Sequence, residues 1–240
     1  MSLKKSTRRE VLAVLGAGVG AVLAGCGSTP TTPSATTTSG GGTSSTGSCV
    51  VTPSETEGPY PDKTGMINNS AFFRRDITEG TSGLPLTLTL TIVNVNSSCA
   101  AVSSANVEIW QCDAAGRYSE YSQPGYDGSA QTFLRGIQTT DPNGQVTFTT
   151  IYPGWYAGRA THIHVDVFRS GALVKTTQIA FPESISAAVY ATGVYASKGQ
   201  NSTTNSSDNV FSDGTTNELA TVTGNTTSGY TATLTIGIAV

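Results

Sequence analysis

Charged residues are scarce in this chain of 240 residues: 12% are Asp, Glu, Lys or Arg, and the formal net charge is −3. Coiled coils and helical bundles are rich in Ala, Glu, Lys and Leu, so this composition argues against both. Nucleic-acid binding needs a basic face, which 13 basic against 16 acidic residues do not favour. We therefore expect no nucleic-acid partner.

Long hydrophobic runs are missing from the N-terminal region. The apolar run at 11–24 is too short to span a bilayer comfortably. It follows a basic stretch and ends in small residues, so residues 1–25 are predicted to be a signal peptide. Arg8 and Arg9 resemble a twin-arginine signal, with the general export route as the alternative. Residues 23–26 resemble a bacterial lipobox, which would place a lipid on Cys26.

The segment that follows has almost no side chains able to form a core. Apart from Ala35, residues 27–47 are all Gly, Ser, Thr or Pro, a composition typical of a flexible linker. We expect residues 26–47 to be a lipidated tether and residues 48–240 to be the folded domain. The predicted location is the extracytoplasmic face of a bacterial membrane, with the lipid as the only membrane contact.

Cysteine is rare, and only three cysteines follow Cys26: Cys49, Cys99 and Cys112. An exported protein can form disulfides, and three cysteines allow three alternative single pairings. We favour Cys49 with Cys99, because Cys112 lies in a predicted strand beside a candidate site. The other two pairings stay open.

Helical periodicity is also largely absent, whereas alternation of apolar and polar residues is clear at 86–95. Such alternation predicts a half-buried strand. Further strands are predicted at 107–110, 145–151, 162–168, 173–181 and 230–240, and one short helix within 184–196. Many short strands joined by polar turns indicate an all-β fold. We expect an antiparallel β-sandwich of immunoglobulin- or transthyretin-like topology whose long loops carry a metal site.

Only two histidines are present, and they are two positions apart: His162 and His164. On a strand, residues i and i+2 point to the same side, so both imidazoles would face one metal ion. With no third histidine, a three-histidine zinc site is excluded. Asp166 on the same face would suit a two-histidine, one-carboxylate iron(II) site, and the nearby tyrosines at 152 and 156 would suit iron(III). An exposed histidine pair without metal is the remaining alternative.

Several separated stretches, in order, resemble the intradiol ring-cleavage dioxygenases, the family of catechol, hydroxyquinol and protocatechuate dioxygenases. The stretches are residues 56–60, 107–119, 133–141, 150–156 and 159–164, with a weaker match at 208–214. The resemblance implies one non-haem iron(III) per subunit, bound by Tyr118, Tyr156, His162 and His164. Tyr156 is preferred to Tyr152 as the second tyrosine ligand, because it has the family's Pro-Gly-x-Tyr spacing.

The resemblance also implies roles around the iron. Tyr156 would take a substrate proton, Arg159 would stabilise developing negative charge, and Gln178 matches a family glutamine of the site. The candidate substrate-binding residues are Tyr60, Tyr152 and Trp155, with packing as the alternative role for the last two. Pro61 stands where the family often has a second tyrosine, so the substrate pocket departs from the family pattern there.

The function implied is cleavage of a small aromatic diol by O2 between its two hydroxylated carbons, giving a cis,cis-muconate-type product. The alternative is a lipid-anchored β-sandwich that binds a ligand without catalysis. The sequence leaves the particular catechol and the oligomeric state open, a homo-oligomer included.

Overall fold

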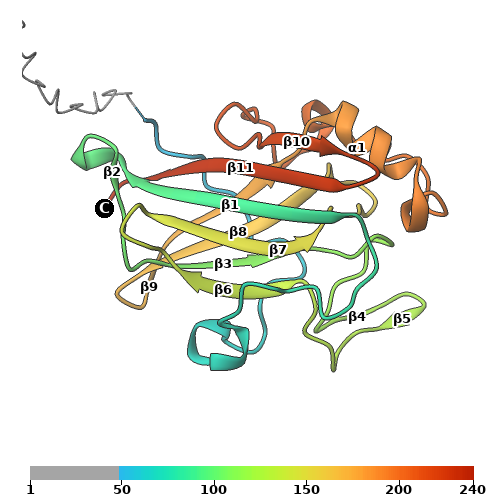
Figure 1. Cartoon of the computed structure of the whole chain (residues 1–240), viewed down its shortest axis with the longest axis horizontal. Coiled ribbons are helices and arrows are strands. Elements are labelled where there is room, and N and C mark those ends of the chain that lie inside the picture. The colour runs from blue at the N-terminus through green and yellow to red at the C-terminus, as the bar shows by residue number, and fades with distance from the viewer. Residues whose placement is uncertain (1–48) are drawn as a thin grey trace, which may run out of the picture. The chain divides into compact units, whose positions relative to one another are not determined.

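The computed structural model describes residues 49–240. The predicted signal peptide, Cys26 and the linker to residue 47 lie outside the described residues and stay predictions. Most regular structure in the described part is strand, as predicted (Figure 1). No helix in this part is long and apolar enough to cross a membrane.

The strands form two main sheets and one small hairpin. The first sheet contains β10 (Thr221–Asn225), β11 (Gly229–Ile238), β1 (Pro85–Asn94) and β2 (Ala100–Ala101), with β7 (Gln145–Ile151) also paired to β1. The second has the order β6 (Arg135–Thr139), β3 (Asn106–Trp110), β8 (His162–Arg169) and β9 (Ala172–Ala180). The hairpin joins β4 (Ser122–Gln123) and β5 (Tyr126–Asp127). In Figure 1, β11, β1 and β7 pass in front of β8 and β9.

The helices are few and short. The α-helix α1 (Glu183–Tyr190) falls within the segment where a short helix was predicted. The 3-10 turns are η1 (Met66–Asn68), η2 (Ser70–Phe72), η3 (Val95–Ser97), η4 (Gly193–Tyr195) and η5 (Asn205–Ser207). Two of the turns, η1 and η2, precede β1, and the other three lie in connections between strands, so the sheets carry the fold.

One hydrophobic core lies between the two main sheets. From the first sheet it takes the alternating Leu86, Leu88, Leu90 and Ile92 of β1, while the threonines between them point outward. From the second sheet it includes Ile163, Val165 and Val167 of β8, all fully buried. Each such aliphatic side chain contributes roughly 1.5–3 kcal/mol when it leaves water. The even-numbered residues of β8, including both histidines, therefore point away from this core.

The prediction of a wholly antiparallel fold is wrong at one pair of strands. β1 and β11 run parallel, with Leu86 opposite Tyr230 and Ile92 opposite Ile236. Side chains alternate with the same period of two in parallel and antiparallel strands. Alternation in the sequence therefore identifies both strands but not their relative direction.

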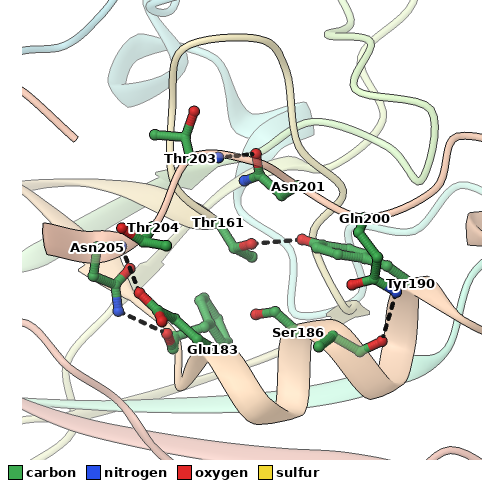
Figure 2. Close-up of a pocket in the computed structure, with 11 residues that line it drawn as sticks. Thr161, Glu183, Ser186, Tyr190, Gln200, Asn201, Thr203, Thr204 and Asn205 are labelled. Atoms are coloured by element: carbon green, nitrogen blue, oxygen red, sulfur yellow. Dashed lines mark hydrogen bonds between the residues drawn. The ribbon is translucent and has the colours of Figure 1, made fainter. Parts of the chain in front are cut away.

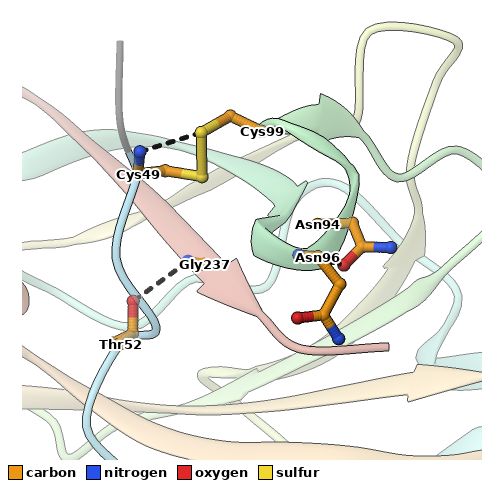
Figure 3. The surroundings of a disulfide bond; sticks show 6 residues. All are labelled: Cys49, Thr52, Asn94, Asn96, Cys99 and Gly237. Atoms are coloured by element: carbon orange, nitrogen blue, oxygen red, sulfur yellow. Dashed lines mark hydrogen bonds between the residues drawn. A yellow bond between two sulfur atoms is a disulfide. The ribbon is translucent and has the colours of Figure 1, made fainter.

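The structure joins Cys49 to Cys99, the pairing favoured from the sequence, and leaves Cys112 as a buried free thiol. The disulfide fastens the start of the domain to the turn after η3 (Figure 3). Close by, Thr52 forms two 3.0 Å hydrogen bonds with the backbone of Gly237, through its own N–H and its hydroxyl. The N-terminal segment is thus attached to β11 as well.

We expect loss of this disulfide to weaken the fold without changing the site. Linking residues 50 positions apart reduces the freedom of the unfolded chain, so the double variant C49A/C99A should lose about 2–4 kcal/mol of unfolding free energy. Urea denaturation measures the loss, and Cys112→Ala alone serves as the single-thiol control. An unchanged unfolding midpoint in C49A/C99A would show that the bond contributes nothing.

Candidate metal centre

Four rings from three segments meet on the side of β8 that faces away from the core. His162 and His164 lie on β8, Tyr118 in the loop after β3, and Tyr156 in the loop after β7. The Nε2 atoms of the two histidines are 3.1 Å apart. Around the group, ring centroids are 5.8 Å apart for Tyr118 and Tyr156, 5.5 Å for Tyr156 and His162, and 6.2 Å for Tyr118 and His164. The four predicted ligands therefore form a closed ring.

A tight turn in the first loop places Tyr118. The carboxylate of Asp113 accepts hydrogen bonds from the backbone N–H groups of Ala115 and Arg117, each at 2.9 Å. Gly116 has a φ of +82°, which glycine adopts without strain. The turn then presents Tyr118, whose N–H donates to Gln123 Oε1 at 2.6 Å. The Asp-Ala-Ala-Gly-Arg-Tyr sequence thus encodes the position of this phenol.

The second tyrosine loop packs directly on the first. A Cβ atom at Gly154 would lie 2.1 Å from the carbonyl oxygen of Asp113, so only glycine permits this contact. Two residues later the chain presents Tyr156, which is half-buried, whereas Tyr118 is fully buried. The close backbone contact explains the glycine two positions before this tyrosine.

Burial favours the neutral form of both imidazoles, and a hydrogen bond orients His162. Burial, with the Arg159 charge as the next cause, lowers the pKa of His162 to about 3. Burial, followed by the charges of His162 and Arg159, holds the pKa of His164 well below its ordinary value. The Nδ1 atom of His162 lies 2.7 Å from the Ala160 carbonyl, which fixes the tautomer with a lone pair on Nε2. Neutral imidazole is the form that binds metals.

The phenols also fit a cation. Burial raises the pKa of Tyr118 well above 10, and it raises that of Tyr156 while Arg159 partly opposes the rise. The Tyr118 hydroxyl is buried and has no hydrogen-bond partner among residues 49–240, although a buried polar group normally has one. A metal ion would supply the partner, and two phenolate oxygens with two imidazole nitrogens are donors that suit iron(III). The residues present therefore fit the iron that the resemblance implies.

Arg159 lies next to Tyr156, and the buried carboxylate of Asp208 orients its guanidinium. Its Nε atom donates to both oxygens of Asp208, at 2.9 and 3.1 Å. Its Nη2 atom donates to Gln178 Oε1 at 2.5 Å, and Nη1 is 3.4 Å from the Tyr156 hydroxyl. Asp208 also accepts the Ala160 N–H at 2.6 Å. Gln178 stands opposite His164 in the β8–β9 register, so it joins Arg159 to the histidine strand.

Of the predicted substrate-binding residues, Tyr60 contacts two of the four rings. It stacks on Tyr118 with centroids 4.6 Å apart and meets Tyr156 edge-on at 5.8 Å. Its ring is partly exposed, so Tyr60 covers the site from the solvent side.

The structure places Tyr152 in the main core and Trp155 against residues 198 and 199. Tyr152 is fully buried in the main core and its hydroxyl pairs with Ser186 at 2.8 Å. The indole N–H of Trp155 donates to the Gly199 carbonyl, and the Lys198 ammonium lies over the ring. These contacts match the packing role given as the alternative, and substrate binding by the two residues stays a prediction.

The carboxylate alternative also finds no support. Among residues 49–240, the His, Cys, Asp and Glu side chains that bring three ligand atoms within 4.8 Å of one another are Glu55, Asp213 and Glu218. Asp166 does not complete such a group with the two histidines. It lies opposite Glu108 on β3 instead.

Two site residues were not identified from the sequence. Asp208 belongs to the weakly matching stretch 208–214, but nothing local shows that it pairs with an arginine 49 positions away. Trp110 lies opposite His164 in the β3–β8 register and stacks on its ring, with centroids 4.7 Å apart and planes within 2°. Its place in the alternation of 107–110 was the available signal, since it shares a face with the histidines.

A pocket of about 150 Å³ lies beside the centre, between α1 and the loop at 200–205 (Figure 2). None of the four candidate ligands lines it. The Tyr190 hydroxyl pairs with Thr161 at 2.6 Å, and Asn201 donates to the Arg159 carbonyl at 2.9 Å. This region holds the backbone just before His162 in place.

Comparison with known proteins finds related dioxygenases. The Dioxygenase family model matches residues 56–188. An intradiol ring-cleavage dioxygenase from Tetranychus urticae is 29% identical, with a TM-score of 0.70, over 80% of this chain and 95% of that one. The dioxygenase domain of a carbohydrate-binding fusion protein from Streptomyces sp. SirexAA-E is 28% identical, with a TM-score of 0.58, over 80% and 99% of the two chains.

A more distant structure shares the fold. The 3-chlorocatechol 1,2-dioxygenase from Rhodococcus opacus 1CP is 20% identical, with a TM-score of 0.53, over 78% of this chain and 72% of that one. No curated protein matches the sequence. The chain belongs to the intradiol ring-cleavage dioxygenase family.

Proposed function

We propose that this protein opens the ring of a catechol-type diol with O2, at one iron(III) per subunit bound by Tyr118, Tyr156, His162 and His164. The observation that carries the proposal is the closed group of four rings, in which the buried Tyr118 hydroxyl has no hydrogen-bond partner among residues 49–240. Iron(III), when bound, supplies a Lewis acid that withdraws electron density from the diol and makes its ring reactive toward O2. The β-sandwich and its long loops would serve as the rigid support for these side chains.

The two tyrosines have different surroundings and therefore different proposed roles. Tyr118 is fully buried beneath Tyr60, which suits a ligand that stays in place. Tyr156 is half-buried and lies within reach of Arg159. We assign to the Tyr156 oxygen the role of accepting a proton from the incoming diol.

Arg159 is proposed to stabilise the negative charge that develops on the diol and its ring. Asp208 and Gln178 hold the guanidinium through Nε and Nη2, so its direction is set before substrate arrives. Donors fixed in this way cost no reorganisation during the reaction and act strongly where water is excluded. Tyr60 is proposed to contact the substrate ring at the mouth of the site.

Oxygen labelling tests the proposed reaction. The iron-loaded protein is incubated with catechol under ¹⁸O2, and the product is analysed by mass spectrometry. We expect O2 and catechol to be consumed in equal amounts and both labelled atoms to appear in a cis,cis-muconate-type diacid. A protein that binds catechol without consuming O2 would instead be the non-catalytic binding module.

We also propose that the protein is exported and held at the membrane by a lipid on Cys26. The support is the basic, apolar and lipobox order of residues 1–26. Labelling of cells with radioactive palmitate should mark the wild-type chain and leave Cys26→Ala unmarked. Equal labelling of both chains would contradict the assignment.

A further inference from the structure

Three carboxylates outside the proposed iron centre lie close together. Glu55 belongs to the segment before β1, and Asp213 and Glu218 belong to the connection before β10. One carboxylate oxygen of each lies within 4.8 Å of one oxygen of each of the others. Among residues 49–240, none of the three forms an ion pair. The charge of Glu218 raises the pKa of Lys175, although burial lowers it more. The Lys175 ammonium donates its hydrogen bonds to the Thr52 carbonyl and the Ser54 hydroxyl, not to Glu218.

Glu218 is the buried member of this group, and one of its carboxylate oxygens is unpaired among residues 49–240. Its side chain is fully buried, and Oε1 accepts a hydrogen bond from Thr177 at 2.9 Å. The second oxygen, Oε2, is buried and has no partner among residues 49–240. A buried carboxylate oxygen without a partner is costly. Burial, opposed by Thr177 and increased by the charges of Glu55 and Asp213, raises the pKa of Glu218 to about 7.

We propose that Glu55, Asp213 and Glu218 bind a hard divalent cation, calcium by the chemistry of the donors. Calcium binds carboxylate oxygens at about 2.3–2.6 Å, so two of its ligands lie at most about 5 Å apart. The oxygens here meet that limit. Glu218 is buried, Glu55 is partly exposed and Asp213 is exposed, so the site supplies one inner carboxylate and leaves an open side for water ligands. Calcium tolerates such irregular coordination better than magnesium does.

The bound cation would fasten the N-terminal segment over the proposed iron centre. The Glu55 N–H donates to the Thr176 carbonyl on β9 at 3.1 Å. The next residue, Thr56, accepts a 2.7 Å hydrogen bond from Gln178, which also contacts Arg159. A cation on Glu55 would join this segment, which continues to Tyr60, to the connection before β10. None of the three carboxylates is a proposed iron ligand, so calcium binding requires neither the iron nor the reaction.

Thermal unfolding of the iron-loaded protein tests the site. Samples contain either calcium chloride or a calcium-selective chelator, and isothermal titration with calcium measures the affinity directly. With calcium near 100 times its dissociation constant, we expect the wild-type Tm to rise by roughly 5–10 °C. Glu218→Gln and Asp213→Asn should lose this rise and the titration heat, because each removes a charged ligand.

Asp213→Asn is included in case Glu218→Gln fails to fold. Asp213 is exposed, so its substitution should leave the protein folded. Asp127→Asn removes an exposed carboxylate outside the group and should respond to calcium as the wild type does. In chelator, Glu218→Gln should be at least as stable as wild type, because repulsion within the group falls. Absence of a calcium response in the wild type, or an equal response in all variants, would overturn the proposal.

Discussion

Tyr118→Phe is expected to lose its bound iron and to reduce ring cleavage by about 10³-fold or more, as is typical when one member of a catalytic group acting as a unit is removed. The substitution deletes only a hydroxyl that is fully buried and has no hydrogen-bond partner among residues 49–240. Removing such an unpaired polar atom is nearly neutral or stabilising for folding. Activity should therefore fall while the unfolding free energy stays the same or rises slightly. Iron content, turnover with catechol and urea denaturation measure the three quantities.

Tyr152→Phe is the matched control for this substitution. Tyr152 is equally buried and lies only four positions before Tyr156, but its hydroxyl pairs with Ser186 in the core. This variant should keep its iron and its activity while losing about 1 kcal/mol of stability, the usual value of one hydrogen bond. If Tyr118→Phe kept full iron and activity, or if Tyr152→Phe lost them, the ligand assignment would be wrong.

Arg159→Lys should lower kcat by about 10²–10³-fold, the range seen when one fixed donor to a developing negative charge is removed. Lysine keeps the positive charge beside buried Asp208, so the fold does not retain an unpaired carboxylate. It lacks the planar fork that contacts Asp208 and Gln178 together. The loss should therefore fall on kcat more than on KM, with iron content unchanged.

Arg117→Lys provides the comparison for Arg159→Lys. Arg117 also pairs with an aspartate, Asp113, through Nε at 2.8 Å, but its side chain is 46% exposed and lies outside the ring of ligands. Its kcat should stay within about threefold of wild type, because an exposed ion pair contributes little. Equal losses in both variants would mean that Arg159 acts through general stability and not through the reaction.

The strands were predictable because burial of one face of a strand requires apolar and polar residues to alternate in the sequence. The alternation at 86–95 identified β1 almost to the residue, since each leucine enters the core and each threonine faces outward. The parallel pairing of β1 with β11 was not predictable, because residues 86 and 230 are far apart in the sequence and alternation carries no information on direction. Strand direction depends on this long connection and not on local pattern.

The site was predictable where residues close in sequence carry it. The spacing of His162 and His164 placed both imidazoles on one face without further knowledge, and the family resemblance supplied Tyr118 and Tyr156. The position of Tyr152 in the main core was not predicted, because a loop, unlike a strand, gives no rule for the direction of successive side chains. Asp208 was missed because its role depends on a contact across 49 positions.

The visible absorption spectrum of the purified, iron-loaded protein tests the central claim most directly. Two tyrosine ligands on iron(III) should produce a phenolate-to-iron charge-transfer band. Catechol added without O2 should shift the band to longer wavelength, because the diol enters the same coordination sphere. Tyr118→Phe should lack the wild-type band, and Tyr152→Phe should retain it. A wild-type protein that stays colourless after iron loading would contradict the iron centre and the ring-cleavage function with it.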